Sequence, residues 1–300
     1  VGRANMKTVN PIKLTPALPL LALLAFVGLT AEARGSALAP SQGERLNSSV
    51  RPGSKITYFD LLRELFPDLA ADGTAHRSVP VRSTSQPRER NAVEGDIKFD
   101  FRPYPFKSGG RKLLMLWVEI KADGVNEGTP YEGEAVVLAV YGLGPAFKLL
   151  DAVDVKADRF TGFWKDRPLF RMDSRNDAFV VYNTHWNAGE SFLGIDMLFV
   201  DEGRIKTVAS LFLYNTQGCG VGFDETPAFR AAADPGNKYP KVFVSVELKK
   251  GRDGETCDHP ARGYVRHYRG VYRWSGAKGR YVGGSRQLDR LDKFNGRRVS

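Results

Sequence analysis

The sequence predicts a mostly β protein: an antiparallel sandwich or barrel-like β domain with a short N-terminal helix and a small C-terminal helix. From residue 96 onward, short runs rich in Val, Leu, Ile, Phe and Tyr recur, each bounded by turn residues. Several joints between the runs have hairpin length, which favours antiparallel pairing. Helical crossovers between the runs are missing, which argues against a parallel α/β fold.

The first forty residues have the order of an export signal. Two lysines precede an apolar run over residues 17–29, and two small-x-small sites, at residues 31–33 and 37–39, follow it. The run is shorter than the about 20 residues that a transmembrane helix needs. We therefore expect residues 1–39 to be a signal peptide with an upstream extension. The mature chain would then be periplasmic or secreted, with no transmembrane segment. The alternative is a buried helix of a cytosolic protein.

Residues 40–95 are expected to form a flexible leader, one short helix and a polar linker. Thr57 and Asp60 have the spacing of a helix cap, and apolar residues then recur at helical intervals as far as Phe66. Pro67 cannot continue this helix, so we place it at 57–66. Residues 71–95 hold two prolines and four arginines, and we expect an irregular linker there.

Residues 96–300 are expected to form a single antiparallel β domain with a basic C-terminal tail. The expected strands are 97–101, 112–120, 135–141, 147–155, 169–172, 179–185, 192–200, 205–214, 242–248 and 263–274. Every residue of Leu113–Val118 is apolar, which predicts a central strand covered on both faces. Residues 227–233 could form a second helix, and we expect a last, basic helix over 285–294.

The chain has two cysteines, Cys219 and Cys257, in glycine-rich and polar segments. Two cysteines in an exported chain usually pair, so we predict a disulfide between them. The alternative is an envelope hydrolase that uses Cys219 as its nucleophile, with His259 or His267 as the base. A carboxylate such as Asp196, which lies inside an otherwise apolar strand, is a second catalytic candidate.

Positive charge is concentrated near the C-terminus. The net charge is +10, and residues 241–300 alone hold 15 Lys and Arg against 6 Asp and Glu. Basic and aromatic residues alternate there, and such a surface can bind an anion by ion pairing and stacking. The candidate binding residues are Tyr264, Arg266, Tyr268, Arg269, Arg273 and Trp274. In a second explanation, the aromatic face packs in the core and the arginines face solvent.

The sequence holds no motif for a cofactor, and the spacing of its four histidines is not that of a metal site. A specific catalytic constellation is also missing. We therefore predict a non-enzymatic binding protein for an anionic envelope component, either an anionic glycan or a lipid head group. An exported protein would not meet intracellular nucleic acid, so we do not expect nucleic acid as the partner.

Overall fold

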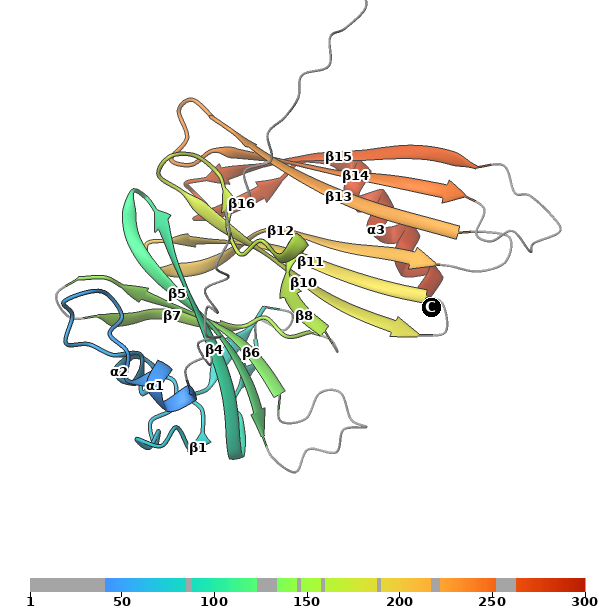
Figure 1. Ribbon diagram of the computed structural model, residues 1–300. Coiled ribbons are helices and arrows are strands. Elements are labelled where there is room, and N and C mark those ends of the chain that lie inside the picture. Colours follow the sequence, from blue (N-terminus) through green and yellow to red (C-terminus); the bar gives the residue numbers. More distant parts are fainter. Residues whose placement is uncertain are drawn as a thin grey trace, which may run out of the picture. The chain divides into compact units, whose positions relative to one another are not determined.

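The computed structural model describes residues 41–84, 88–122, 134–144, 147–157, 160–187, 190–216, 222–251 and 263–299. The chain divides into two units, Val1–Ala39 and Pro40–Ser300. The predicted signal peptide lies outside the described residues, as do Cys219, Cys257 and His259. In the second unit, strands dominate and two sheets form a sandwich-like arrangement with three helices (Figure 1), which confirms the predicted fold class.

The first sheet has seven strands in the order β1-β4-β5-β6-β7-β2-β3. Their bounds are β1 (Ala75–Arg77), β2 (Val81–Ser83), β3 (Arg90–Asn91), β4 (Glu94–Ser108), β5 (Arg111–Ala122), β6 (Glu134–Gly142) and β7 (Lys148–Asp154). The pairing of β2 with β7 is parallel, and the other pairings in this sheet are antiparallel. β1, β2 and β3 lie where we expected an irregular linker. Strands of two or three residues are too short to show a periodic pattern, and pairing with longer neighbours holds them extended.

β5 is covered on both faces, as its continuous apolar sequence predicts. Leu114 and Leu116 belong to a core on one face of the first sheet. Met115 and Trp117 belong to a second core, which also contains residues of the other sheet. Because side chains alternate between the two faces of a strand, one apolar run supplies both cores.

Two short helices pack against the first of these cores: α1 (Gln42–Leu46) and α2 (Tyr58–Leu62). The predicted cap is a capping box, in which Asp60 N donates to Thr57 Oγ1 at 3.3 Å and Thr57 N donates to Asp60 Oδ2 at 2.8 Å. α2 is shorter than the expected 57–66, but the turns that follow it still bury Leu65 and Phe66. α1 lies within the expected leader and is held there by its fully buried Leu46.

The second sheet has nine strands, in the order β16-β15-β14-β13-β12-β11-β10-β8, with β9 paired to β10. Their bounds are β8 (Phe160–Phe163), β9 (Phe170–Arg171), β10 (Asp177–Asn187), β11 (Glu190–Asp201), β12 (Arg204–Thr216), β13 (Gly222–Ala232), β14 (Lys241–Gly251), β15 (Tyr264–Ser275) and β16 (Arg280–Gly283). A 3-10 turn, η1 (Trp164–Asp166), follows β8. Most of residues 227–233, which we considered as a helix, are strand β13, because they pair along their length with β14.

The expected hairpin between β11 and β12 is present and has a two-residue turn. Glu202 and Gly203 both have positive φ, 51° and 83°. A turn of this kind matches the right-handed twist of paired strands, and a glycine in its second position adopts positive φ without steric cost. The turn therefore sets the register of β11 and β12 from the hairpin as far as Leu198, where the register shifts.

The two sheets pack face to face through β10 and β11. Leu198 and Val200 of β11 lie in the core shared with the first sheet, whereas Met197 and Phe199 lie in a third core on the opposite face. Across the interface, the ring centroids of Phe106 and Phe179 are 4.9 Å apart. The alternation of apolar residues along β11 thus supplies the core on each face of the second sheet.

The C-terminal helix α3 (Arg286–Val299) fills a gap in the second sheet, at the place where we expected a basic helix (Figure 1). β12 and β13 pair only at Thr216 and Phe223, and α3 contacts β12 and β15 on either side of the gap. Asn295 of α3 is fully buried, and its Nδ2 donates to Phe212 O at 2.9 Å and to Glu225 Oε2 at 2.7 Å. A helix side chain thereby satisfies β12 backbone that lacks a neighbouring strand.

Candidate functional site

Several hollows of the described chain combine charged and aromatic side chains, and two of these are each lined by three basic residues. The first, of about 850 Å³, lies on β13, β14 and β15 beside the first turn of α3, and we call it the basic groove. The second, of about 460 Å³, lies between the first sheet and β8, and we call it the inter-sheet cleft. Both volumes fall within the roughly 300–1,000 Å³ that is usual for small-molecule sites.

The basic groove is built from strand register. Phe243 on β14 stands between Arg230 on β13 and Val271 on β15, which are its cross-strand neighbours. The lining residues are Ala228, Phe229, Arg230, Phe243, Val244, Ser245, Arg269, Gly270, Val271, Gly284, Ser285, Arg286 and Gln287. Four separate segments of the sequence, 228–230, 243–245, 269–271 and 284–287, therefore meet in one hollow.

The groove carries uncompensated positive charge. Arg230, Arg269 and Arg286 line it, and no carboxylate does. In the part of the chain that the structure describes, none of these three arginines forms an ion pair. The guanidinium carbon of Arg230 lies 4.2 Å from the ring centroid of Phe243, a cation–π contact between two lining residues of the groove.

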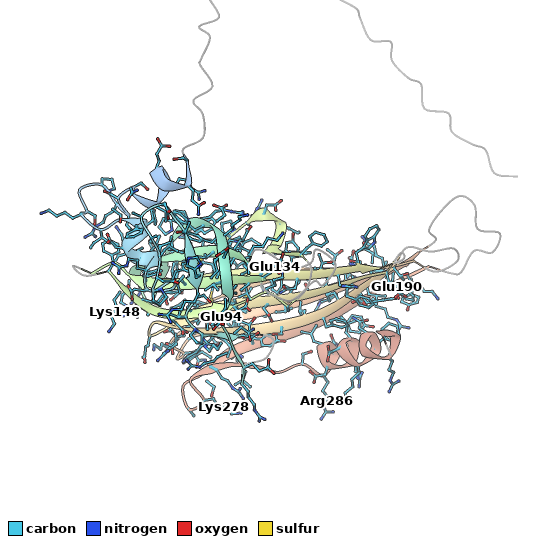
Figure 2. The ribbon with its side chains drawn as sticks, turned by 90° about the horizontal axis from the view of Figure 1, so that it is seen from below. Glu94, Glu134, Lys148, Glu190, Lys278 and Arg286 are labelled. Atoms are coloured by element: carbon cyan, nitrogen blue, oxygen red, sulfur yellow. The ribbon has the colours of Figure 1, made fainter. Side chains whose placement is uncertain are left out.

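The first turn of α3 is fastened to β15 at the wall of the groove. Ser285 Oγ donates to Arg269 O and accepts from Gln287 N at 3.1 Å, while Gln287 Oε1 accepts from Arg269 N at 2.9 Å. Gly270 permits this approach, since a Cβ there would lie 2.5 Å from Leu288 Cδ1. Figure 2 shows Arg286 at the start of this helix. The N-terminal end of a helix adds partial positive charge to that of the arginines.

Of the six predicted binding residues, Arg269 lines the groove. Tyr264 and Arg266 lie at the other end of β15, where the Arg266 guanidinium carbon is 4.6 Å from the Tyr264 ring centroid. Tyr268 packs against the core on the α3 side of the sheet. The structure therefore does not bring these residues together in one hollow.

The remaining two predicted residues have structural partners. Arg273 Nη1 pairs with the buried Asp234 Oδ1, and although burial alone would raise the pKa of Asp234, the Arg273 hydrogen bond leaves that pKa below its usual range. Trp274 is only 6% exposed, and its ring centroid lies 4.8 Å from that of Tyr239. Trp274 has no surface to offer a ligand, and the aromatic face of β15 packs against the core as the second explanation expected.

Asp201 is the centre of a closed network beside Trp274. Its Oδ1 accepts from Tyr239 Oη at 2.6 Å and Lys238 Nζ at 2.9 Å, and its Oδ2 accepts from Lys206 Nζ at 2.6 Å. Burial raises the pKa of Tyr239 to about 12, so its hydroxyl stays a donor at neutral pH. With both oxygens engaged, this carboxylate stabilises the fold rather than binding a ligand.

Sequence reasoning misses Arg230, Phe243 and Arg286 as site residues. They belong to three segments that become neighbours only through the pairing of β13, β14 and β15 and the docking of α3. The one signal that could have found them is the basic C-terminal segment, which includes Arg286.

The catalytic candidates are not assembled among the described residues. Asp196 is half-buried on β11, burial raises its pKa, and Ser210 Oγ donates to it. His267 is exposed on β15, with Nδ1 3.8 Å from Glu247 Oε2. Asp196 and His267 therefore stand on strands that are four places apart in the sheet. The alternative that pairs Cys219 with His259 lies outside the described residues.

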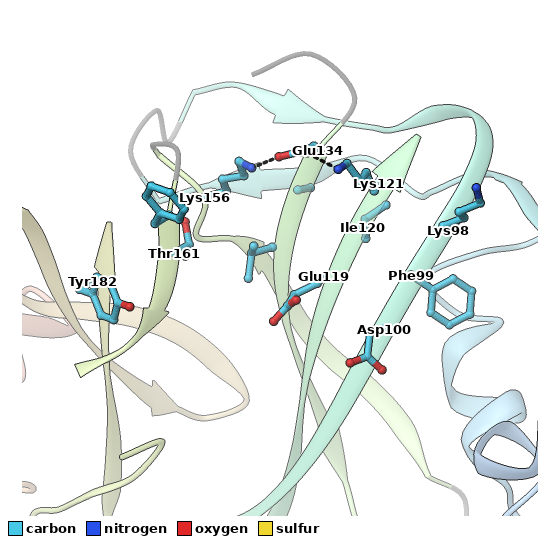
Figure 3. A pocket seen from close by; sticks show the side chains of 13 residues that line it. Lys98, Phe99, Asp100, Glu119, Ile120, Lys121, Glu134, Lys156, Thr161 and Tyr182 are labelled. Atoms are coloured by element: carbon cyan, nitrogen blue, oxygen red, sulfur yellow. Dashed lines mark hydrogen bonds and ion pairs between the residues drawn. The ribbon is translucent and has the colours of Figure 1, made fainter. Parts of the chain in front are cut away.

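The inter-sheet cleft differs from the groove in its charge (Figure 3). Its lining residues are Lys98, Phe99, Asp100, Glu119, Ile120, Lys121, Glu134, Ala135, Val136, Lys156, Phe160, Thr161 and Tyr182. The lining of the cleft thus contains three lysines and three carboxylates. Glu134 Oε2 pairs with Lys156 and Glu134 Oε1 lies 3.5 Å from Lys121 Nζ, and the Lys156 hydrogen bond lowers the pKa of Glu134.

Comparison with protein-family models, with curated proteins and with solved structures finds no match for the chain. Among the described residues, no helix is long and apolar enough to cross a membrane. In the same part of the chain, no three His, Cys, Asp or Glu residues are grouped as they would be around a metal ion. The geometry of the two hollows is therefore the basis for assigning a function.

Proposed function

We propose that this chain is an exported, non-enzymatic binding protein that holds an anionic envelope component in the basic groove. The observation that carries the proposal is the lining: three arginines that lack ion-pair partners among the described residues, with no carboxylate beside them. Uncompensated charge of one sign in a concave surface attracts ligands of the opposite sign.

The chemistry of the groove suits a phosphate or a carboxylate attached to an apolar or sugar moiety. Guanidinium groups bind both anions through two parallel hydrogen bonds. Phe229 and Phe243 offer apolar surface next to those charges, and Ser245 offers a hydroxyl. An anionic glycan and a lipid head group share this chemistry, and the experiment below distinguishes them.

The predicted disulfide belongs to the same proposal. Thr216 and Gly222 border the segment that holds Cys219, and Gly251 and Gly263 border the segment that holds Cys257. Gly222 and Gly251, the described residues next to the two cysteine-containing segments, pair with each other at one end of β13 and β14, which supports the predicted disulfide. A disulfide between Cys219 and Cys257 would stabilise the fold by about 4 kcal/mol, because it closes the chain between them into a loop.

The alternative function, an envelope hydrolase that uses Cys219, is separated from this proposal by counting free thiols. The purified, unreduced protein is titrated with a thiol reagent under denaturing conditions. Absence of reactive thiol supports the disulfide and contradicts the cysteine hydrolase. Two reactive thiols contradict the disulfide and favour the hydrolase.

Binding to two kinds of anionic probe tests the groove. Vesicles of phosphatidylglycerol represent the lipid source, oligogalacturonate represents the glycan source, and vesicles of phosphatidylcholine are the neutral control. We expect binding to one anionic probe that weakens about tenfold or more between about 0.05 M and 0.5 M salt, because the ion pairs are screened. The triple variant Arg230→Ser, Arg269→Ser, Arg286→Ser should weaken that binding about 100-fold.

A second triple variant removes three positive charges, as the first does, but outside the groove, and serves as its control. Arg77, Arg111 and Lys148 are exposed residues of the first sheet, and their replacement by serine should change affinity less than about threefold. Equal losses in the two triple variants would show that net charge, not the groove, binds the anion. Absence of binding to either anionic probe, or binding that is indifferent to salt, would also overturn the proposal.

A further inference from the structure

We propose that the inter-sheet cleft is a second binding site, separate from the basic groove, and that it takes a neutral saccharide. The two hollows share no lining residue. One wall of the cleft comes from β4, β5 and β6 of the first sheet, and the other comes from β8 and β10 of the second.

The wall of the first sheet presents oriented hydrogen-bonding groups. Asp100 Oδ1 accepts from Arg45 Nη1 at 2.7 Å and from Phe101 N at 2.8 Å. Glu119 Oε1 accepts from Trp117 Nε1 at 2.7 Å and from Arg102. Within the described chain, the second oxygen of each carboxylate has no partner. Each carboxylate is thus fixed by one oxygen and keeps the other as an acceptor, which a sugar hydroxyl can donate to.

The opposite wall presents aromatic rings. Phe160 is 57% exposed, an unusual loss of hydrophobic burial for a phenylalanine. Tyr182 also lines the cleft, while its ring contacts Trp164 and packs against the third core. Gly162 of β8 is the cross-strand partner of Tyr182, and a Cβ there would lie 2.9 Å from Tyr182 Cε1. The missing side chain at Gly162 therefore lets the tyrosine ring lie across the edge strand. Figure 3 shows Tyr182 and Thr161 on this side of the cleft and Lys98, Asp100 and Glu119 on the other.

The combination points to a sugar ring. A pyranose has one face of C–H groups that packs on an aromatic ring, and a rim of hydroxyls that both donate and accept hydrogen bonds. The lysines of the cleft are hydrogen-bond donors, and the second oxygens of Asp100 and Glu119 are acceptors. Glu134 is paired with Lys121 and Lys156, and the other two carboxylates are paired with Arg45 and Arg102. The charges described in the cleft are therefore engaged in ion pairs and do not form an unpaired cluster of one sign that would attract an anion. The chemistry therefore favours a neutral saccharide over an acidic one.

Titration of the intact protein with three neutral oligosaccharides tests the proposal: cellotetraose, maltotetraose and chitotetraose, followed by calorimetry or by NMR. We expect at least one to bind, with an affinity that changes less than about twofold over the salt range that weakens the groove. Phe160→Ala should weaken it about tenfold, and the exposed side chain makes this variant safe for folding. Glu119→Gln should also weaken saccharide binding, because one of the two acceptor oxygens of the Glu119 carboxylate is replaced by a donor NH2 group.

Trp186→Ala is the matched control. Trp186 is 67% exposed and does not line the cleft, so its loss should leave saccharide affinity unchanged. The groove triple variant should also leave it unchanged, which keeps the two sites separable. Absence of binding to all three oligosaccharides, an undiminished affinity in Phe160→Ala, or an equal loss in Trp186→Ala would overturn the proposal.

Discussion

The basic groove and the inter-sheet cleft both combine charge with aromatic rings, yet they differ in charge compensation. The groove has three arginines and no carboxylate, whereas the cleft has three lysines and three carboxylates, with Glu134 held between two lysines. An uncompensated cluster acts on anions over a Debye length and is weakened by salt. A compensated cluster acts only at hydrogen-bond distance. A count of the basic residues alone, three in each hollow, would miss this difference.

The two hollows also differ in what holds their walls. One wall of the groove is the start of α3, which occupies the gap between β12 and β13 and is anchored there by Asn295. The cleft lies between elements of the two sheets, whose shared core includes Trp117 and Phe163. The groove should therefore depend on the seating of one helix, and the cleft should not.

The largest expected effect comes from loosening α3, on which the groove should depend and the cleft should not. Asn295→Ala removes both hydrogen bonds of the buried amide and leaves Phe212 O and the Glu225 carboxylate short of a donor. We expect it to lower the free energy of unfolding by about 2–3 kcal/mol, measured by urea denaturation. Anion binding should weaken about tenfold as the first turn of α3 loosens, while saccharide affinity stays the same.

Lys293→Ala is the control for that helix. Lys293 is exposed on α3, and its loss should change stability by less than about 0.5 kcal/mol. If Asn295→Ala weakened saccharide binding as much as anion binding, the cleft would depend on α3 too, and the comparison would fail.

A smaller effect is expected from crowding the cleft. In Gly162→Ala, the new methyl group would meet the Tyr182 ring and displace it from its place across β8. We expect saccharide affinity to fall by about threefold to fivefold, because one stacking surface is misplaced, and anion affinity to be unaffected. Calorimetry with each probe measures both. Gly276→Ala, where a Cβ would meet nothing within 4 Å, is the matched control.

The smallest effect concerns pH in the cleft. The Lys156 hydrogen bond holds the pKa of Glu134 below its ordinary value of 4.5. A carboxylate with a lowered pKa stays ionised above that ordinary value, and its ion pair is lost only as the pH falls through the lowered pKa. Saccharide affinity should therefore change less than about twofold between pH 7 and pH 5. An NMR titration that places the Glu134 midpoint above 4.5 would contradict this prediction.

Much of the fold was accessible from local sequence. The cap at Thr57 and Asp60 and the unbroken apolar run of β5 each predict a feature that the structure shows. β13 was missed because its residues lack strand periodicity and it pairs fully with β14 alone. β8 was missed because four residues around a glycine carry no pattern.

The sites were less accessible than the fold. The pattern of basic and aromatic residues near the C-terminus includes Arg269, which lines the groove. The same pattern includes Trp274, which is buried, and Arg273, which pairs with Asp234. Alternation along one strand shows which residues share a face. It does not show which face another element covers.

By itself, the sequence determined the fold class, the double coverage of β5, the C-terminal helix and the excess of positive charge near the end of the chain. These features follow from neighbouring residues, whose periodicity and turn chemistry act over a few positions. The tertiary structure alone decided which charges are compensated. Whether an arginine has a carboxylate partner depends on strand register and helix docking between segments far apart in sequence. Arg230, Arg269 and Arg286 meet without an acid, and Lys156 meets Glu134, only once the sheets are paired.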